Sequence, residues 1–99
     1  MPIFAVTLGS GPMWQRSVDP TNQVGEMDHA AFMQKLLNDR FLLFGGPMSD
    51  SPGNRALLVV IAPSLEIVRS RLAEDPWMRS GVLDLVEVRG WDVRYGELV

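Results

Sequence analysis

Proton transfer is the chemistry that the residue types of this chain support best, because its 99 residues include a single histidine, His29, and no cysteine. Imidazole is the side chain that most readily gains and loses a proton near neutral pH. His29 falls where a helix is expected to begin, in the segment 25–32. The best candidate partner for its ring is the carboxylate of Asp75. We therefore consider acid/base chemistry by His29, with Asp75 holding one ring nitrogen so that the other faces a substrate.

His29 also has a structural explanation. It shares the spacing of one helix face with Met33 and Leu36, so it borders the apolar stripe of the expected helix. A histidine there can be a general acid or base in a pocket wall, or a partly buried group bound to a backbone carbonyl. The neighbouring Asp28 points in a different direction on a helix, and it is better explained as a first-turn acid favoured by the helix dipole.

Asp75 has two possible roles as well. An aspartate before a proline is a common start of a short helix, here expected over 76–80, with Asp75 as the N-cap and Pro76 at the first helical position. Capping and orienting His29 conflict only in part, because a carboxylate has two oxygens. Spacing alone leaves both roles open.

Four further residues are candidates for a substrate pocket. Gly46, Pro47 and Met48 follow a short apolar strand, where a turn can present backbone N–H groups to a ligand oxygen, although strand-ending turns of this kind are frequent. Trp77, close to Asp75, is a candidate pocket wall, although tryptophans more often belong to a core or an interface. No metal site is expected, because the chain has no cysteine and one histidine.

Composition and charge argue against several classes of partner. The formal net charge is −3, and the nine basic residues form no cluster, whereas nucleic acids and anionic membranes require a concentrated basic face. The longest apolar run, 56–62, is far shorter than the roughly 20 residues that span a bilayer. The N-terminal residues do not follow the pattern of a secretion signal. We expect one soluble, cytoplasmic domain over residues 1–99, with a small molecule as its partner.

The order of the expected elements predicts the fold. Apolar runs predict strands over 3–8, 41–44, 55–62 and 82–93, with helices over 27–38 and from Ser64, as N-cap, towards Pro76. Polar segments rich in glycine and proline, 10–25 and 45–54, are expected to be loops. The order βαββαβ is the ferredoxin-like arrangement of the α+β class, a four-stranded antiparallel sheet with two helices on one face.

The third expected strand indicates that the sheet has a second buried face. Residues 57–61 are apolar at every position, so they point to both faces of the sheet, whereas two helices can cover only one. Soluble monomers rarely leave a large apolar patch exposed. We therefore expect a homodimer that packs sheet to sheet about a two-fold axis.

Taken together, these features resemble the YciI-like (YCII-related) family over nearly the whole chain. The similarity depends on the order of several short motifs: His29 at a helix start, Leu42-Leu43-Phe44-Gly45-Gly46-Pro47, the strand 57–61, Ser64-Leu65-Glu66, Asp75-Pro76-Trp77 followed by Gly81, and Val86-Glu87-Val88-Arg89-Gly90-Trp91. The resemblance implies a dimeric α+β barrel with a His–Asp pair at a cleft, carried here by His29 and Asp75. It also implies cofactor-independent chemistry on a small ring compound, since one member dehydrochlorinates a chlorinated hydroxyquinol.

Two departures from the family pattern concern the substrate. Many members carry an arginine three residues before the histidine, where this chain has Glu26, and an acidic residue would repel an anionic substrate. The loop 10–25 is also distinctive and could form a lid over the cleft.

Three hypotheses follow. The leading one is a cofactor-independent lyase, isomerase or dehydrochlorinase-like enzyme, in which His29 is the general acid/base, Asp75 orients it, and Gly46, Pro47, Met48 and Trp77 line the pocket. The alternative is a non-catalytic small-molecule-binding or regulatory dimer with the same cleft. The third is a structural interaction module, in which both motif residues serve the helices alone.

Overall fold

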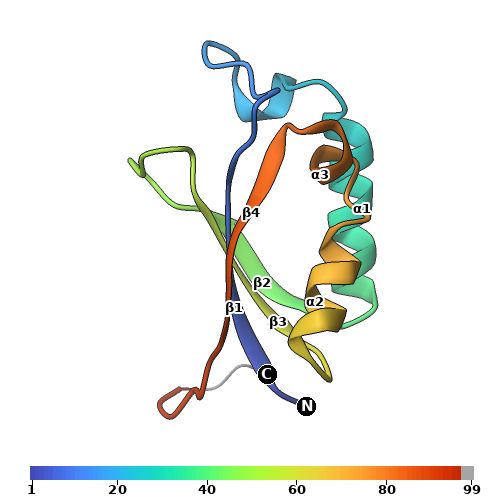
Figure 1. Cartoon of the computed structure of the whole chain (residues 1–99), viewed down its shortest axis with the longest axis vertical. Coiled ribbons are helices and arrows are strands. Elements are labelled where there is room, and N and C mark those ends of the chain that lie inside the picture. The colour runs from blue at the N-terminus through green and yellow to red at the C-terminus, as the bar shows by residue number, and fades with distance from the viewer. Residues whose placement is uncertain (97–99) are drawn as a thin grey trace.

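The computed structural model describes residues 1–96 (Figure 1). Its elements follow in the order β1 (Ile3–Ser10), the short 3-10 helix η1 (Pro20–Asn22), α1 (Glu26–Asn38), β2 (Leu42–Pro47), β3 (Ala56–Ile61), α2 (Leu65–Leu72), α3 (Pro76–Ser80) and β4 (Leu83–Gly90). The short α3 aside, this is the predicted βαββαβ order.

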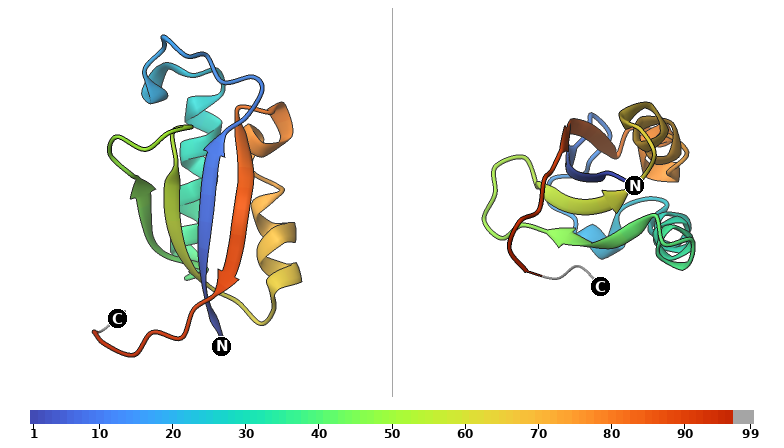
Figure 2. Two further views of the ribbon diagram at one scale, coloured as in Figure 1. Left: turned by 60° about the vertical axis from the view of Figure 1, so that its left-hand side comes forward. Right: turned by 90° about the horizontal axis from the view of Figure 1, so that it is seen from below.

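The four strands form one antiparallel sheet in the order β2-β3-β1-β4. The helices lie against one face of it, and the other face is left open (Figures 1 and 2). The predicted α+β, ferredoxin-like architecture is confirmed. Because α1 precedes β2 and α3 precedes β4, the start of α1 and all of α3 lie close together at the end of the sheet where β1 finishes (Figure 1).

The register of β1 and β3 separates the two faces of the sheet. Phe4 is opposite Val60 and Val6 is opposite Leu58, and all four side chains belong to the buried core beneath the helices. Residues alternate along a strand, so the intervening positions face the other way. These outward-facing residues are Ile3, Ala5 and Thr7 on β1 and Leu57, Val59 and Ile61 on β3. The consecutive apolar residues of 57–61 therefore do point to both faces, as predicted.

Local sequence signals set the helix boundaries. Ser64 caps α2, since its hydroxyl accepts the backbone N–H of Ile67 at 3.2 Å. The αL conformation of Gly81, with φ 85°, ends α3, and this conformation favours glycine. Gly25 precedes α1 in the same conformation, with φ 82°. It directs the loop 10–25 into the helix that carries His29.

Some of the predicted strand boundaries were wrong. The second strand was predicted to end at Phe44, but β2 continues through Gly45 and Gly46 to Pro47, opposite Leu58, Leu57 and Ala56 of β3. A proline is tolerated there because β2 lies at the edge of the sheet. The register shifts between Leu42 and Phe44. The fourth strand is also shorter than predicted and ends at Gly90.

No helix within residues 1–96 is both long enough and apolar enough to cross a membrane.

Candidate functional site

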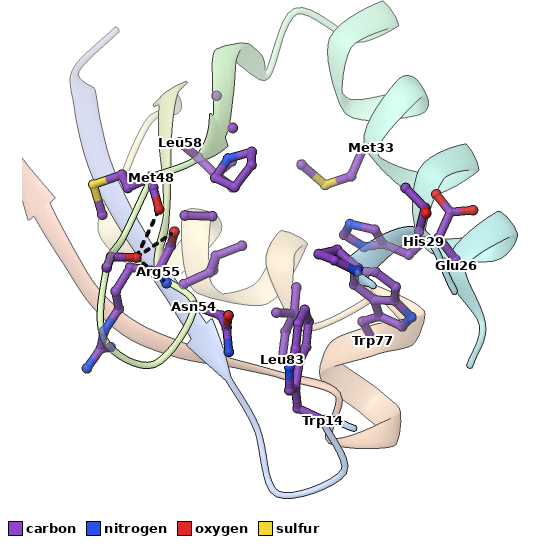
Figure 3. Close-up of a pocket in the computed structure, with 18 of the residues that line it drawn as sticks. Trp14, Glu26, His29, Met33, Met48, Asn54, Arg55, Leu58, Trp77 and Leu83 are labelled. Carbon is purple, nitrogen blue, oxygen red and sulfur yellow. Dashed lines mark hydrogen bonds between the residues drawn. The ribbon is translucent and has the colours of Figure 1, made fainter. Parts of the chain in front are cut away.

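A cavity of about 420 Å³ opens at the end of the molecule where α1 begins (Figure 3). Its volume lies within the range of small-molecule sites. It lies between α1, the loop 10–25 and the ends of β2 and β3. Its wall is formed by Leu8, Trp14, Pro20, Thr21, Glu26, His29, Met33, Gly45, Gly46, Pro47, Met48, Asp50, Ser51, Asn54, Arg55, Ala56, Leu58, Trp77 and Leu83.

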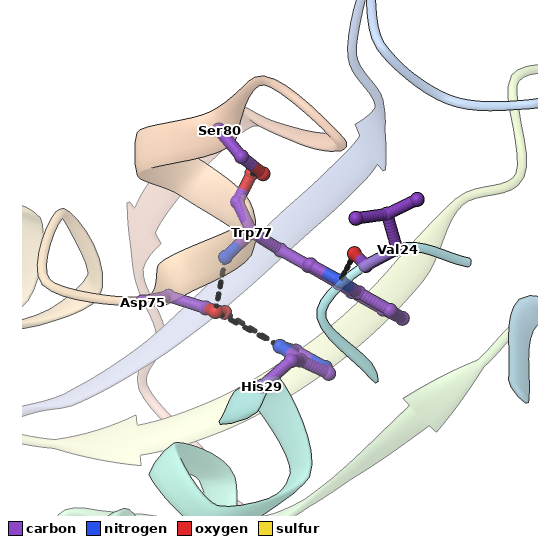
Figure 4. A network of polar contacts seen from close by, with 5 residues as sticks. All are labelled: Val24, His29, Asp75, Trp77 and Ser80. Atoms are coloured by element: carbon purple, nitrogen blue, oxygen red, sulfur yellow. Dashed lines mark hydrogen bonds and ion pairs between the residues drawn. The ribbon is translucent and has the colours of Figure 1, made fainter. Parts of the chain in front are cut away.

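His29 and Asp75 are in direct contact, although they are 46 residues apart in the sequence (Figure 4). The imidazole Nδ1 lies 2.9 Å from both carboxylate oxygens of Asp75. The His29 side chain is 17% exposed, while that of Asp75 is 2% exposed. The aspartate is therefore behind the histidine, away from solvent, and it is not part of the cavity wall.

The contact fixes which nitrogen of the neutral imidazole carries the proton. A carboxylate only accepts hydrogen bonds, so Nδ1–H is the donor to Asp75. The Nε2 lone pair is then free, and Nε2 has no hydrogen-bond partner among the side chains of residues 1–96. Since His29 is part of the cavity wall, this nitrogen can accept a proton from a bound molecule.

Asp75 makes the contacts that both roles left open by the sequence require. Its Oδ1 accepts the backbone N–H of Trp77 at 2.9 Å, which caps α3. The carboxylate thus binds the start of one helix and the histidine of another. No buried side-chain nitrogen or oxygen of residues 1–96 lacks a hydrogen-bond partner, and both oxygens of this buried acid are hydrogen-bonded.

Trp77 packs against the flat face of the His29 ring. Its indole stacks on the His29 ring with the centroids 3.9 Å apart and the planes 8° from parallel. The indole Nε1–H donates to the carbonyl of Val24 at 2.7 Å (Figure 4). The imidazole is therefore held by a hydrogen bond at its edge and by an aromatic face, and the aromatic residue is itself bound to the loop 10–25.

The family model of the YCII-related domain matches residues 15–92, a span that contains His29, Asp75 and most of the cavity wall.

The chain belongs to the YCII-related family.

A solved structure supports the fold of this YCII-related domain. It is that of 5-chloro-2-hydroxyhydroquinone dehydrochlorinase (TftG) from Burkholderia phenoliruptrix AC1100, in complex with 2,5-dihydroxybenzoquinone. The two chains are 19% identical, with a TM-score of 0.59 over 95% of each chain. At this identity the similarity shows a common fold. No curated protein matches the chain significantly by sequence.

The loop 10–25 of this YCII-related domain has an internal structure of its own. Gln23 is 3% exposed, and its side chain accepts the backbone N–H of Gln15 and donates to the carbonyls of Gln15 and Val18. The Gln23 side chain thus pairs backbone N–H and C=O groups that have no helix or sheet partner in this irregular segment. The loop also brings the Trp14 ring edge-on to Trp77, with centroids 6.3 Å apart.

Asp19 strengthens the same loop. The hydroxyl and the backbone N–H of Thr21 both donate to Asp19 Oδ1, at 2.7 and 2.9 Å. The two bonds lower the pKa of this carboxyl below its usual value, the hydroxyl bond being the larger cause. They cap η1 at the side of the cavity where Pro20 and Thr21 contribute to the wall.

The structure brings five of the six sequence-predicted site residues into one wall. The cavity is lined by His29 from α1, by Trp77 from α3, and by Gly46, Pro47 and Met48 at the end of β2. Asp75 contacts the wall through His29. Among residues 1–96, no group of three or more histidine, cysteine, aspartate or glutamate side chains could hold a metal ion.

The cavity wall includes residues that sequence reasoning did not assign to it. Leu58 and Leu83 contribute from the sheet, and Asn54 and Ser51 from the β2–β3 loop. The Leu58 position could be anticipated from its strand, because it alternates with outward-facing neighbours. The loop residues carried no signal, since their placement depends on the fold of the hairpin.

Proposed function

We propose that this YCII-related protein is a cofactor-independent enzyme of the lyase or isomerase type, which moves protons on a small molecule bound in the cavity. His29 is the general acid/base and Asp75 is the residue that orients it. The observation that carries the proposal is the 2.9 Å contact of His29 Nδ1 with the buried Asp75 carboxylate. The dehydrochlorinase of the same fold supports chemistry of this class.

The reaction begins with the free lone pair of Nε2. It accepts a proton from an acidic C–H or O–H of the substrate, and Asp75 stabilises the imidazolium that forms. The electron pair of the broken bond then forms a double bond. In an elimination the leaving group departs with the electron pair of its bond to the substrate, and the imidazolium then releases its proton to water. In an isomerisation the imidazolium returns the proton to another atom of the substrate. The substrate contacts the cavity wall at Gly46, Pro47, Met48 and Trp77.

Hydrogen exchange tests the proposal without knowledge of the natural substrate. The protein is incubated in D2O with a panel of small hydroxylated quinols, lactones and ketoacids, and loss of C–H signals is followed by 1H NMR. We expect at least one compound to exchange faster than in buffer, because proton abstraction precedes any later step. A panel on which exchange never exceeds the buffer rate would contradict the proposal.

A non-catalytic small-molecule-binding or regulatory dimer is the second candidate. It is favoured by the structural duties of the pair, since Asp75 caps α3 and the His29 ring packs flat on Trp77. A ligand that binds equally well to the wild type, His29→Ala and Asp75→Asn, and that is never converted, would support this candidate.

We also propose that the protein forms a homodimer, and the open face of the sheet supports this. Phe44 is 50% exposed and Val86 is 47% exposed. They flank the outward-facing apolar residues of β1 and β3, which we call the open apolar face and which comprise Ile3, Ala5, Leu57, Val59 and Ile61. Val59 is itself buried, and the other four are half-buried. A second copy packed on this face removes its apolar surface from water.

We expect Phe44→Glu to shift the protein from dimer to monomer, because it places a carboxylate within the interface. Sedimentation velocity measures the change. Val24→Glu is the matched control, since Val24 is 71% exposed but lies in the loop 10–25, and it leaves the dimer intact. A wild-type protein that sediments as a monomer would show this part of the proposal to be wrong.

A further inference from the structure

The charged side chains of the cavity wall indicate which kind of ligand the cavity accepts. Glu26 is half-buried and is the first residue of α1, one helical turn before His29. It stands beside the imidazole at the rim of the cavity (Figure 3). The Glu26 carboxylate forms no ion pair with any residue of 1–96. Asp50, on the β2–β3 loop, is the second acidic residue of the wall, but it is exposed to solvent, which screens its charge.

The positive charge of Arg55, the one arginine of the wall, does not offset these carboxylates. The backbone of Arg55 borders the cavity, but its side chain is directed away from His29 (Figure 3). The Arg55 guanidinium instead lies next to Gly9, since a Cβ atom added to this glycine would be 3.0 Å from Arg55 Nη1. Gly9 follows the core residue Leu8 on β1 and so belongs to the opposite face of the sheet. The guanidinium is therefore outside the cavity.

Few other polar groups of the wall are available to a ligand. The hydroxyl of Ser51 is already used, since it accepts the backbone N–H of Arg55 at 2.9 Å and donates to the carbonyl of Met48 at 3.0 Å. The rest of the wall is largely aromatic and aliphatic. A bound molecule thus meets apolar surface, His29, the uncharged amide of Asn54, and the Glu26 carboxylate, which can only accept hydrogen bonds (Figure 3).

We infer that the cavity takes a small ring compound that is neutral or cationic, with an amino or hydroxyl group donating to Glu26, and that it discriminates against anions. Glu26 is the specificity-determining residue. The inference rests on the proposed function in that the same cavity is the substrate site. An anion would be placed beside a carboxylate that forms no ion pair, and no lysine or arginine side chain of residues 1–96 is directed into the cavity to offset that charge (Figure 3).

Three probes that share a benzyl or phenyl ring and differ in charge test the inference: benzylamine, benzyl alcohol and benzoate, at pH 7.5 and 0.15 M salt. Binding is followed by the 1H–13C signals of the single histidine ring. We expect benzylamine to bind more tightly than benzoate by about fivefold or more. In Glu26→Gln the ratio falls to near one. Asp28→Asn is the matched control, because it removes a charge from an exposed site on the same helix turn that is not in the wall.

The outcomes separate the inference from the proposed function. The inference is overturned if benzoate binds as tightly as benzylamine, if the ratio survives Glu26→Gln, if Asp28→Asn lowers it equally, or if no probe perturbs the His29 signals. A ratio that behaves as expected while no compound of the D2O panel ever exchanges supports the ligand class and contradicts the enzymatic function.

Discussion

His29→Gln lowers the rate of substrate C–H exchange by about 10²- to 10⁴-fold, the usual contribution of a general acid/base. Glutamine approximates the size of imidazole and can still donate to Asp75 with its amide, but it has no group that takes up a proton near neutral pH. The rate is measured by 1H NMR in D2O at fixed substrate. The fold is checked by circular dichroism and by the urea midpoint.

Met33→Leu is the matched control for this loss. Met33 lies one turn further along α1, is half-buried and lines the same cavity, yet carries no proton. We expect its exchange rate to stay within about threefold of the wild type, because a volume-conserving apolar exchange is well tolerated. If His29→Gln retains the wild-type rate, the histidine is not the base. If it unfolds the protein, the role of His29 is structural.

Asp75→Ala is expected to lower the stability of the protein through the loss of two contacts. It removes the N-cap of α3, which typically contributes about 0.5–2 kcal/mol. It also leaves the His29 Nδ1–H without an acceptor in a part of the site closed to solvent, at a cost of about 1–3 kcal/mol. We expect the free energy of unfolding, measured by urea titration, to fall by about 2–4 kcal/mol.

Asp39→Ala provides the comparison for this experiment. Asp39 accepts from Arg71 at 2.9 Å, but its side chain is 42% exposed, so its loss changes the free energy of unfolding by at most about 1 kcal/mol. Similar effects of the two substitutions would mean that Asp75 is not the buried link between α1 and α3.

Much of the fold could be predicted because it depends on local patterns. The apolar runs of β1 and β3, the Ser64 cap and the Asp75-Pro76 start of α3 are each encoded within a few residues. The extension of β2 to Pro47 could not be predicted, because glycine and proline normally end a strand. Here they are accepted at a sheet edge, a position that only the assembled strand order defines.

The site could be predicted in part. The types of His29 and Asp75 suggested a pair, but spacing alone left their contact open, and the family resemblance supplied the pairing. The stacking of Trp77 on His29 and the outward direction of Arg55 depend on side-chain packing between distant segments. Such contacts leave no periodic trace in the sequence.

The position of the proton on the neutral His29 ring tests the central claim most directly. Imidazole 15N chemical shifts distinguish the two tautomers, and one histidine makes the assignment unambiguous. We predict the proton on Nδ1 in the wild type, because Asp75 accepts it. In Asp75→Asn the carbonyl oxygen keeps the cap on Trp77 and the amide group faces Nδ1, so the proton moves to Nε2. A wild-type ring protonated on Nε2, or a tautomer unaffected by Asp75→Asn, would contradict the account.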